Sequence, residues 1–167
     1  MRLAIFLIVL PVVTATAAAA EAQRRPLGIF FKWGAFEDQK PRKCFAITEP
    51  AGHEGAKSAP AFASVTSWPG RGAVPQLHFR LARKKRPGSA VILKIDGRSF
   101  QLLAGGANAW ARNEGADAQI IAAMRTGVRM SLNTRAEQGG LIRDIYPLRG
   151  AATAIDAAII ACARPDR

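Results

Sequence analysis

The chain has 167 residues, 49% of them hydrophobic, and its 24 Lys and Arg against 12 Asp and Glu give a formal charge of +12. This length suits one domain with a core of its own. After the first 22 residues, no apolar stretch approaches the roughly 20 residues that a membrane-spanning helix needs. A helical membrane protein is therefore excluded once that first segment is removed.

The first residues are organised like an export signal. Arg2 gives a positive start, residues 3–13 are apolar, and residues 14–20 are small and rich in alanine. Small residues at alternate positions up to Ala22 fit the cleavage rule of secretory signal peptides. Residues 1–22 are therefore predicted to be a cleaved signal peptide. A retained membrane anchor is the alternative, but the apolar run is too short for one.

The predicted mature domain, residues 23–167, keeps the charge of +12 because cleavage removes one cation and one anion, Arg2 and Glu21. Inside a cell such an excess would suggest nucleic acid. An exported protein meets lipid headgroups, lipopolysaccharide phosphates and host glycans instead. We therefore expect an anionic envelope or host-cell surface, or a protein partner, and no nucleic acid. The expected location is periplasmic, outer-membrane-associated or secreted. A high pI that serves only solubility is the alternative.

The first part of the mature chain is predicted to form strands. Residues 29–36 look like one strand, with Ile29, Phe31 and Trp33 alternating onto one face. Residues 42–48 are a second candidate. Residues rich in Gly, Pro, Ala and charge then predict a mobile loop, over residues 49–60.

The middle of the chain alternates apolar and polar residues between turn signals. Strands are predicted over residues 62–68, 76–81, 90–95, 98–103 and 107–112, and then over 128–134 and 141–146. Asp96-Gly97 supplies the positive φ angles of a two-residue hairpin. Residues 116–126 break the pattern and predict a helix, since Asp117 lies in its first turn, Arg125 in its last, and a glycine follows.

The tail is predicted to be a second helix with a buried stripe, made by Leu148, Ala152, Ile155, Ile159 and Cys162. Cys162 would then face the core, where it could meet Cys44 on an early strand. Two cysteines in an oxidising compartment usually form a disulfide, and two buried thiols are the alternative.

Seven to nine short strands with two helices favour a mainly β fold. We predict a β-sandwich with two short peripheral helices, the last at the C-terminus. A small barrel is the alternative.

Signals for chemistry are weak. His53 and His78 are the only histidines, and no metal-binding spacing surrounds them, so no metal and no cofactor are expected. Nor does any serine lie in a nucleophile elbow. Carboxylates are the remaining enzymatic option, and we interpret the adjacent pair Glu37 and Asp38 as solvated surface charges.

The most distinctive polar feature is a run of four cations, predicted to form the tip of a hairpin and to grip phosphates. It consists of Arg83, Lys84, Lys85 and Arg86. Arg71 and Arg80 would extend the patch. A solubilising turn that discourages edge-to-edge sheet pairing is the alternative.

Three tryptophans could stack on sugars, although packing in the core or at its rim is favoured for them. Trp33 is interpreted as a core residue, while Trp68 and Trp110 lie nearer to loops.

Several motifs in order resemble the invasion-associated locus B family, and together they span nearly all of the mature chain. They are Trp33, Cys44-Phe45-Ala46-Ile47, Ile95-Asp96-Gly97, Phe100, Ala109-Trp110, residues 122–127, residues 144–150 and Ala161-Cys162. Pro147, where the family tends to have Ser, indicates a divergent member. The resemblance implies an immunoglobulin-like β-sandwich in the periplasm or at the outer membrane. It also implies a link to host-cell entry, and it brings no catalytic residues.

Two functional hypotheses follow. The first is a non-enzymatic envelope protein that binds an anionic surface or a protein partner. The second is a periplasmic hydrolase acting on an envelope polymer.

Overall fold

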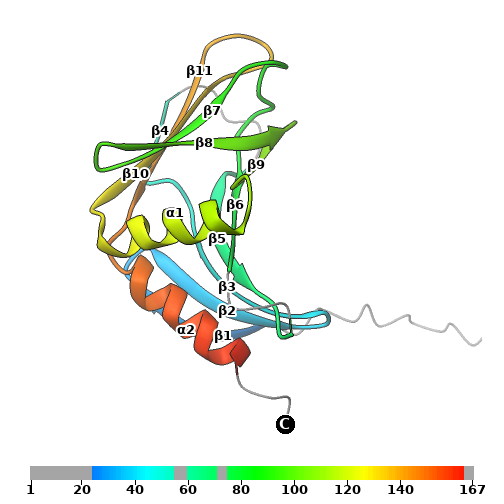
Figure 1. Ribbon diagram of the computed structural model, residues 1–167, viewed down its shortest axis with the longest axis vertical. Coiled ribbons are helices and arrows are strands. Elements are labelled where there is room, and N and C mark those ends of the chain that lie inside the picture. The colour runs from blue at the N-terminus through cyan, green and yellow to red at the C-terminus, as the bar shows by residue number, and fades with distance from the viewer. Residues whose placement is uncertain (1–23, 55–59, 71–74, 164–167) are drawn as a thin grey trace, which may run out of the picture.

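A computed structural model describes residues 24–54, 60–70 and 75–163 of the chain. The predicted signal peptide, residues 1–22, lies outside this part. The described residues form eleven strands and two helices, shown in Figure 1: β1 (Arg24–Phe30), β2 (Trp33–Gln39), β3 (Arg42–Thr48), β4 (Gly52–Glu54), β5 (Phe62–Ser67), β6 (Gln76–Arg80), β7 (Val91–Ile95), β8 (Arg98–Gly105), β9 (Asn108–Trp110), α1 (Glu114–Thr126), β10 (Arg129–Arg135), β11 (Leu141–Pro147) and α2 (Ala151–Ala163).

The strands follow one order, β1-β2-β3-β5-β6-β9-β8-β7-β10-β11-β4, and all pairs are antiparallel. Strand β8 belongs to two layers. Its first part, up to Leu102, pairs with β7, and its last part, from Leu103, pairs with β9. We call the strands from β1 to β9 in this order the first layer and those from β7 to β4 the second layer. Among the described strands this order does not close on itself, so they do not form a closed barrel.

The two layers face each other across one core. The ring of Phe79 on β6 lies 5.9 Å from that of Tyr146 on β11, and the indole N–H of Trp33 donates to the carbonyl oxygen of Pro147. Alternate side chains of β6, β7, β10 and β11 are fully buried between the layers, as strand periodicity requires. Each large one contributes about 1.5–3 kcal/mol by burial. The predicted fold class, mainly antiparallel β with two helices, is confirmed.

Helix α1 is fixed at its start by two acceptors. Asn113 accepts a hydrogen bond from the backbone N–H of Ala116 at 2.9 Å, which caps the helix. Asp117 accepts one from the backbone N–H of Leu77 on β6 at 2.7 Å. The helix therefore begins two residues before the predicted start and is tied directly to the first layer.

Helix α2 packs across β1, β2, β3 and β5 (Figure 1). Its buried face is mostly alanine, and these small side chains allow a close approach to the sheet. The predicted stripe is correct at Ile155 and Cys162 but wrong at Ala152 and Ile159, which are only partly buried, and Leu148 is buried but lies before the helix begins. The buried positions of the helix are Ala151, Ala154, Ile155, Ala158, Ala161 and Cys162. Within the described residues, neither helix is long and apolar enough to span a membrane.

The single strand predicted over residues 29–36 is wrong. The chain turns back at Phe31, whose φ of 58° lies in the left-handed region, and β1 pairs with β2 as a hairpin. Ile29 and Phe31 are 68% and 61% exposed, whereas Trp33 is buried. The guanidinium of Arg149 covers the Phe31 ring at 3.8 Å. The alternation of apolar residues continues through the turn at Phe31, so the sequence pattern did not reveal that the chain reverses there.

The loop predicted over residues 49–60 also contains a strand. Residues 52–54 form β4, which pairs with β11 at one end of the sheet. Residues 55–59 lie outside the described part of the chain.

Candidate functional site

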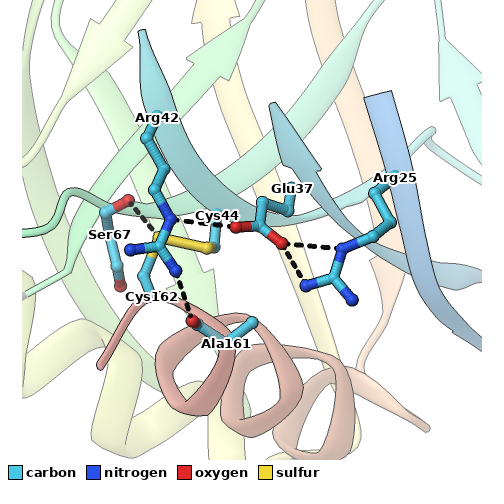
Figure 2. Close-up of polar contacts among 7 residues, drawn as sticks. All are labelled: Arg25, Glu37, Arg42, Cys44, Ser67, Ala161 and Cys162. Atoms are coloured by element: carbon cyan, nitrogen blue, oxygen red, sulfur yellow. Dashed lines mark hydrogen bonds and ion pairs between the residues drawn. A yellow bond between two sulfur atoms is a disulfide. The ribbon is translucent and has the colours of Figure 1, made fainter. Parts of the chain in front are cut away.

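Cys44 and Cys162 form a disulfide, with Cα atoms 5.7 Å apart. This prediction is confirmed. Cys44 lies on β3 and Cys162 near the end of α2, and both are buried. The bond therefore holds the last helix against the first layer (Figure 2).

A cluster of charges surrounds this bond. The carboxylate of Glu37 on β2 accepts hydrogen bonds from Arg25 on β1 and Arg42 on β3 (Figure 2). Arg42 Nη2 also donates to the carbonyl oxygen of Ala161 on α2 at 3.1 Å. The hydrogen bonds from Arg25 and then Arg42 hold the pKa of Glu37 below its usual range. Glu37 is thus an ionised anchor that joins three strands, and through Arg42 it also holds the helix.

The neighbouring acid points to the other face of the sheet. Asp38 accepts a hydrogen bond from Arg24 Nε at 2.8 Å, and its carboxylate lies 3.5 Å from Lys43 Nζ. These contacts, Arg24 first, lower the pKa of Asp38. The interpretation of Glu37 and Asp38 as solvated charges is therefore wrong, because both are buried and paired with cations. They also face opposite sides of β2, so they do not form a catalytic pair over one substrate.

The run of four cations does not form a hairpin tip. Strands β6 and β7, which flank it, do not pair with each other. The backbone N–H of Lys85 donates to the carbonyl of Gly106, and that of Arg86 donates to the carbonyl of Arg135. Lys84 accepts from the backbone N–H of Glu137. The segment is therefore held between the β8–β9 turn and the end of β10, and we call residues 83–86 the basic strap.

Two side chains of the basic strap, Lys84 and Arg86, are exposed. The other two are partly buried and donate to backbone carbonyl oxygens, Arg83 Nη2 to Leu141 and Lys85 Nζ to Arg86, both at 3.0 Å. In the described part of the chain, none of the four forms an ion pair with a carboxylate. Arg83 and Lys84 line a hollow of about 260 Å³, together with Ala136, Glu137 and Gln138.

Two further residues, Arg71 and Arg80, were predicted to extend the patch, and the structure describes only Arg80. Arg71 lies outside the described residues. Arg80 ends β6 and is partly buried, directly before the link to the strap.

A second site lies on the outer face of the first layer, the face turned away from the core. It is an open groove of about 510 Å³ with four aromatic side chains and one imidazole among its walls. We call it the aromatic groove. Its lining comprises Arg24, Lys43, Phe45, Ile47, Phe62, Ser64, Thr66, Trp68, Gln76, His78 and Trp110. Trp68 and Trp110, for which packing was favoured, both line it, whereas Trp33 is a core residue as predicted.

Ring contacts arrange one wall of the aromatic groove. The imidazole of His78 stacks on Trp110, with centroids 5.4 Å apart and an interplanar angle of 17°, and it meets Phe62 edge-on at 5.4 Å. Its Nε2 lies 3.0 Å from the side-chain oxygen of Asn108, so Nε2–H donates there. The sequence did contain a signal, since these residues alternate with the core positions of their strands.

Three or more potential metal-ligating side chains do not gather anywhere among the described residues. The structure therefore offers no candidate metal centre in that part of the chain.

The fold and the bond define a class: a disulfide-closed, antiparallel β protein with a helix locked onto its first layer. No protein-family model matches the chain, and no curated protein matches its sequence. Among solved structures, the crystal structure of invasion associated protein B from Bartonella henselae is similar, with a TM-score of 0.61 at 15% identity. The match covers 82% of this chain and 98% of that one. This comparison shows a distant likeness in fold to an invasion associated protein, at an identity too low to show membership of a family.

Proposed function

We propose that this protein is a non-enzymatic bacterial envelope protein of invasion-associated locus B type, exported by residues 1–22. The mature domain, residues 23–167, binds a phosphate-bearing anionic surface through the basic strap. The observation that carries this proposal is the strap itself, which holds four cations that no described carboxylate neutralises.

Two further features support export to the envelope. A disulfide persists in oxidising compartments and is rare in the cytosol, and this chain has one between its only two cysteines. The fold is similar to that of an invasion associated protein. The anionic surface is then the organism's own lipopolysaccharide and phospholipid, or the surface of a host cell.

The adjacent carboxylates of Glu37 and Asp38 do not support the hydrolase hypothesis as general acids. Glu37 and Asp38 are ionised, buried and bound to cations on opposite faces of β2. A general acid needs a proton to give at working pH, and a lowered pKa removes it. This favours binding over catalysis.

A vesicle experiment tests the proposal. Purified mature protein is sedimented with vesicles of phosphatidylcholine containing 30% phosphatidylglycerol, and separately with lipopolysaccharide, over a range of salt. We expect binding that weakens steeply with salt, because exposed charges are screened beyond about 8–10 Å at 0.1–0.15 M. Serine at the four strap positions should reduce binding at least about tenfold, given roughly 1 kcal/mol per cation near such a surface.

The matched control removes the same amount of charge elsewhere. It places serine at four exposed cations outside the strap, namely Lys94, Arg98, Arg112 and Arg129. If this variant loses as much binding as the strap variant, net charge alone explains attachment and the strap is not a site.

A further inference from the structure

We infer that the aromatic groove is a second binding site, separate from the basic strap, for a negatively charged oligosaccharide. The inference rests on three properties of one open surface: aromatic rings, a surplus of positive charge, and neutral polar side chains between them.

The groove is built by cross-strand rows on the outer face of the first layer. Ile47, Ser64, His78 and Trp110 are direct neighbours across β3, β5, β6 and β9. Side chains that lie opposite each other in a sheet are close enough to act together. This row gives the groove a well-supported floor, because each of these four strands is paired on both sides.

A second row runs one pleat further along the same face. Phe45 lies opposite Thr66, and Thr66 lies opposite Gln76. The two rows together mix apolar side chains and rings with hydroxyl and amide groups. This mixture suits a sugar, because a sugar ring has an apolar face of C–H groups and an edge of hydroxyls. Small-molecule sites in general combine apolar walls with a few polar groups.

The aromatic side chains supply the apolar contact. Trp68, Trp110 and Phe62 are each partly exposed at the groove. An aromatic face carries negative charge density, which attracts the slightly positive C–H groups of a sugar ring. The volume of about 510 Å³ lies within the roughly 300–1,000 Å³ typical of ligand sites.

The charge at one end of the groove selects an acidic sugar. Arg24 and Lys43 both contact the single carboxylate of Asp38. Two cations on one anion leave a surplus of one positive charge. Both cations also lie over the Phe45 ring, at 5.1 and 5.8 Å from its centroid. A carboxylate or sulfate on the sugar would complete the pairing.

Other occupants fit less well. A peptide added as an extra strand needs a free sheet edge, but β3, β5 and β6 are each paired on both sides. An acyl chain needs an enclosed apolar cavity, and this groove is open and contains cations. An acidic oligosaccharide uses side-chain contacts alone, which is what this face provides.

The experiment uses the mature protein and a heparin-derived hexasaccharide, with neutral cellohexaose as the comparison ligand. Binding is measured by calorimetry and by the NMR signals of the indole N–H groups. We expect saturable binding of the acidic hexasaccharide, with shifts at Trp68 and Trp110 and none at buried Trp33. Shifts that spare Trp68 and Trp110 would overturn the inference without any mutation.

Variants separate the two sites. Trp110→Ala and Trp68→Ala should each weaken binding about tenfold, the usual effect of losing a central aromatic contact. Lys43→Gln should remove most of the preference for the acidic sugar. Phe31→Ala, an exposed aromatic outside the groove, is the matched control and should bind normally.

The strap variant, with serine at residues 83–86, gives the decisive contrast. Retained hexasaccharide binding in this variant supports a separate site in the groove. Loss of binding in this variant, with Trp110→Ala unchanged, would assign the sugar to the strap and overturn the inference while leaving the proposed function standing.

Discussion

Glu37 and Arg42 lie on neighbouring strands, and Arg42 Nε donates to Glu37 Oε1 at 2.9 Å while its Nη2 reaches the last turns of α2. This pair therefore couples the sheet to the C-terminal helix beside the disulfide. It provides a polar link where the disulfide provides a covalent one.

The first prediction concerns acid stability. Hydrogen bonds from Arg25 and Arg42 lower the pKa of Glu37 in the folded protein. The stabilisation is therefore complete above the unfolded pKa, about 4.3, and is lost as pH falls through the lower folded value. Unfolding followed by circular dichroism from pH 7 to pH 3 should give a stability that declines below about pH 4.5.

Glu37→Gln should cost about 1–3 kcal/mol at pH 7, mainly because it leaves the largely buried guanidinium of Arg42 without its charged acceptor. Its stability should fall less steeply with acid than that of the wild type. The stability of this variant should still depend partly on pH, because the pKa of Asp38 is also lowered. Asp156→Asn breaks a more exposed pair with Arg125 and should cost less than about 1 kcal/mol. Equal losses in both variants would contradict the prediction.

The second prediction concerns the disulfide. Cys44 and Cys162 are 118 positions apart, and a loop of this size is worth about 4–5 kcal/mol in the chain-entropy account. The double variant Cys44→Ser with Cys162→Ser should lose about that amount in urea unfolding. Reduction of the wild type should match it, and reductant should leave the variant unchanged. A stable reduced protein would contradict this.

The third prediction tests the β1–β2 hairpin. Trp33→Phe deletes the partly buried hydrogen bond to Pro147 that joins the two layers, and the loss of this bond should cost about 1 kcal/mol. Phe31→Ala changes an exposed turn residue and removes its ring contact with Arg149. Its free energy of unfolding should stay within about 0.5 kcal/mol of the wild type. Thermal unfolding checks both. The reverse order would mean that Phe31, not Trp33, is the core residue.

Local signals in the sequence predicted the local structure well. Asp96 and Gly97 have the positive φ values, 42° and 90°, that their hairpin was expected to need. The helix dipole and its flanking glycine predicted α1 to within two residues. The disulfide followed from cysteine number, compartment and helix periodicity, and it is present.

Features that depend on distant partners were out of reach. The strap is held by backbone hydrogen bonds to Gly106, in the β8–β9 turn, and to Arg135, at the end of β10. No pattern near residues 83–86 in the sequence predicts these distant partners. The aromatic groove needs the strand order, because β9 lies beside β6 only after an excursion through β7 and β8. Phe31 takes a left-handed conformation without the Gly, Asn or Asp that usually marks one.

The placement of Cys162 has a consequence for the order in which the protein matures. The first layer has its own strands early in the chain, but the partner of Cys44 is made more than a hundred residues later. β4 likewise waits for β11. In a chain that emerges N-terminus first, the thiol of Cys44 therefore stays unpaired until Cys162 has emerged. The disulfide closes late, after most of the strands have been made.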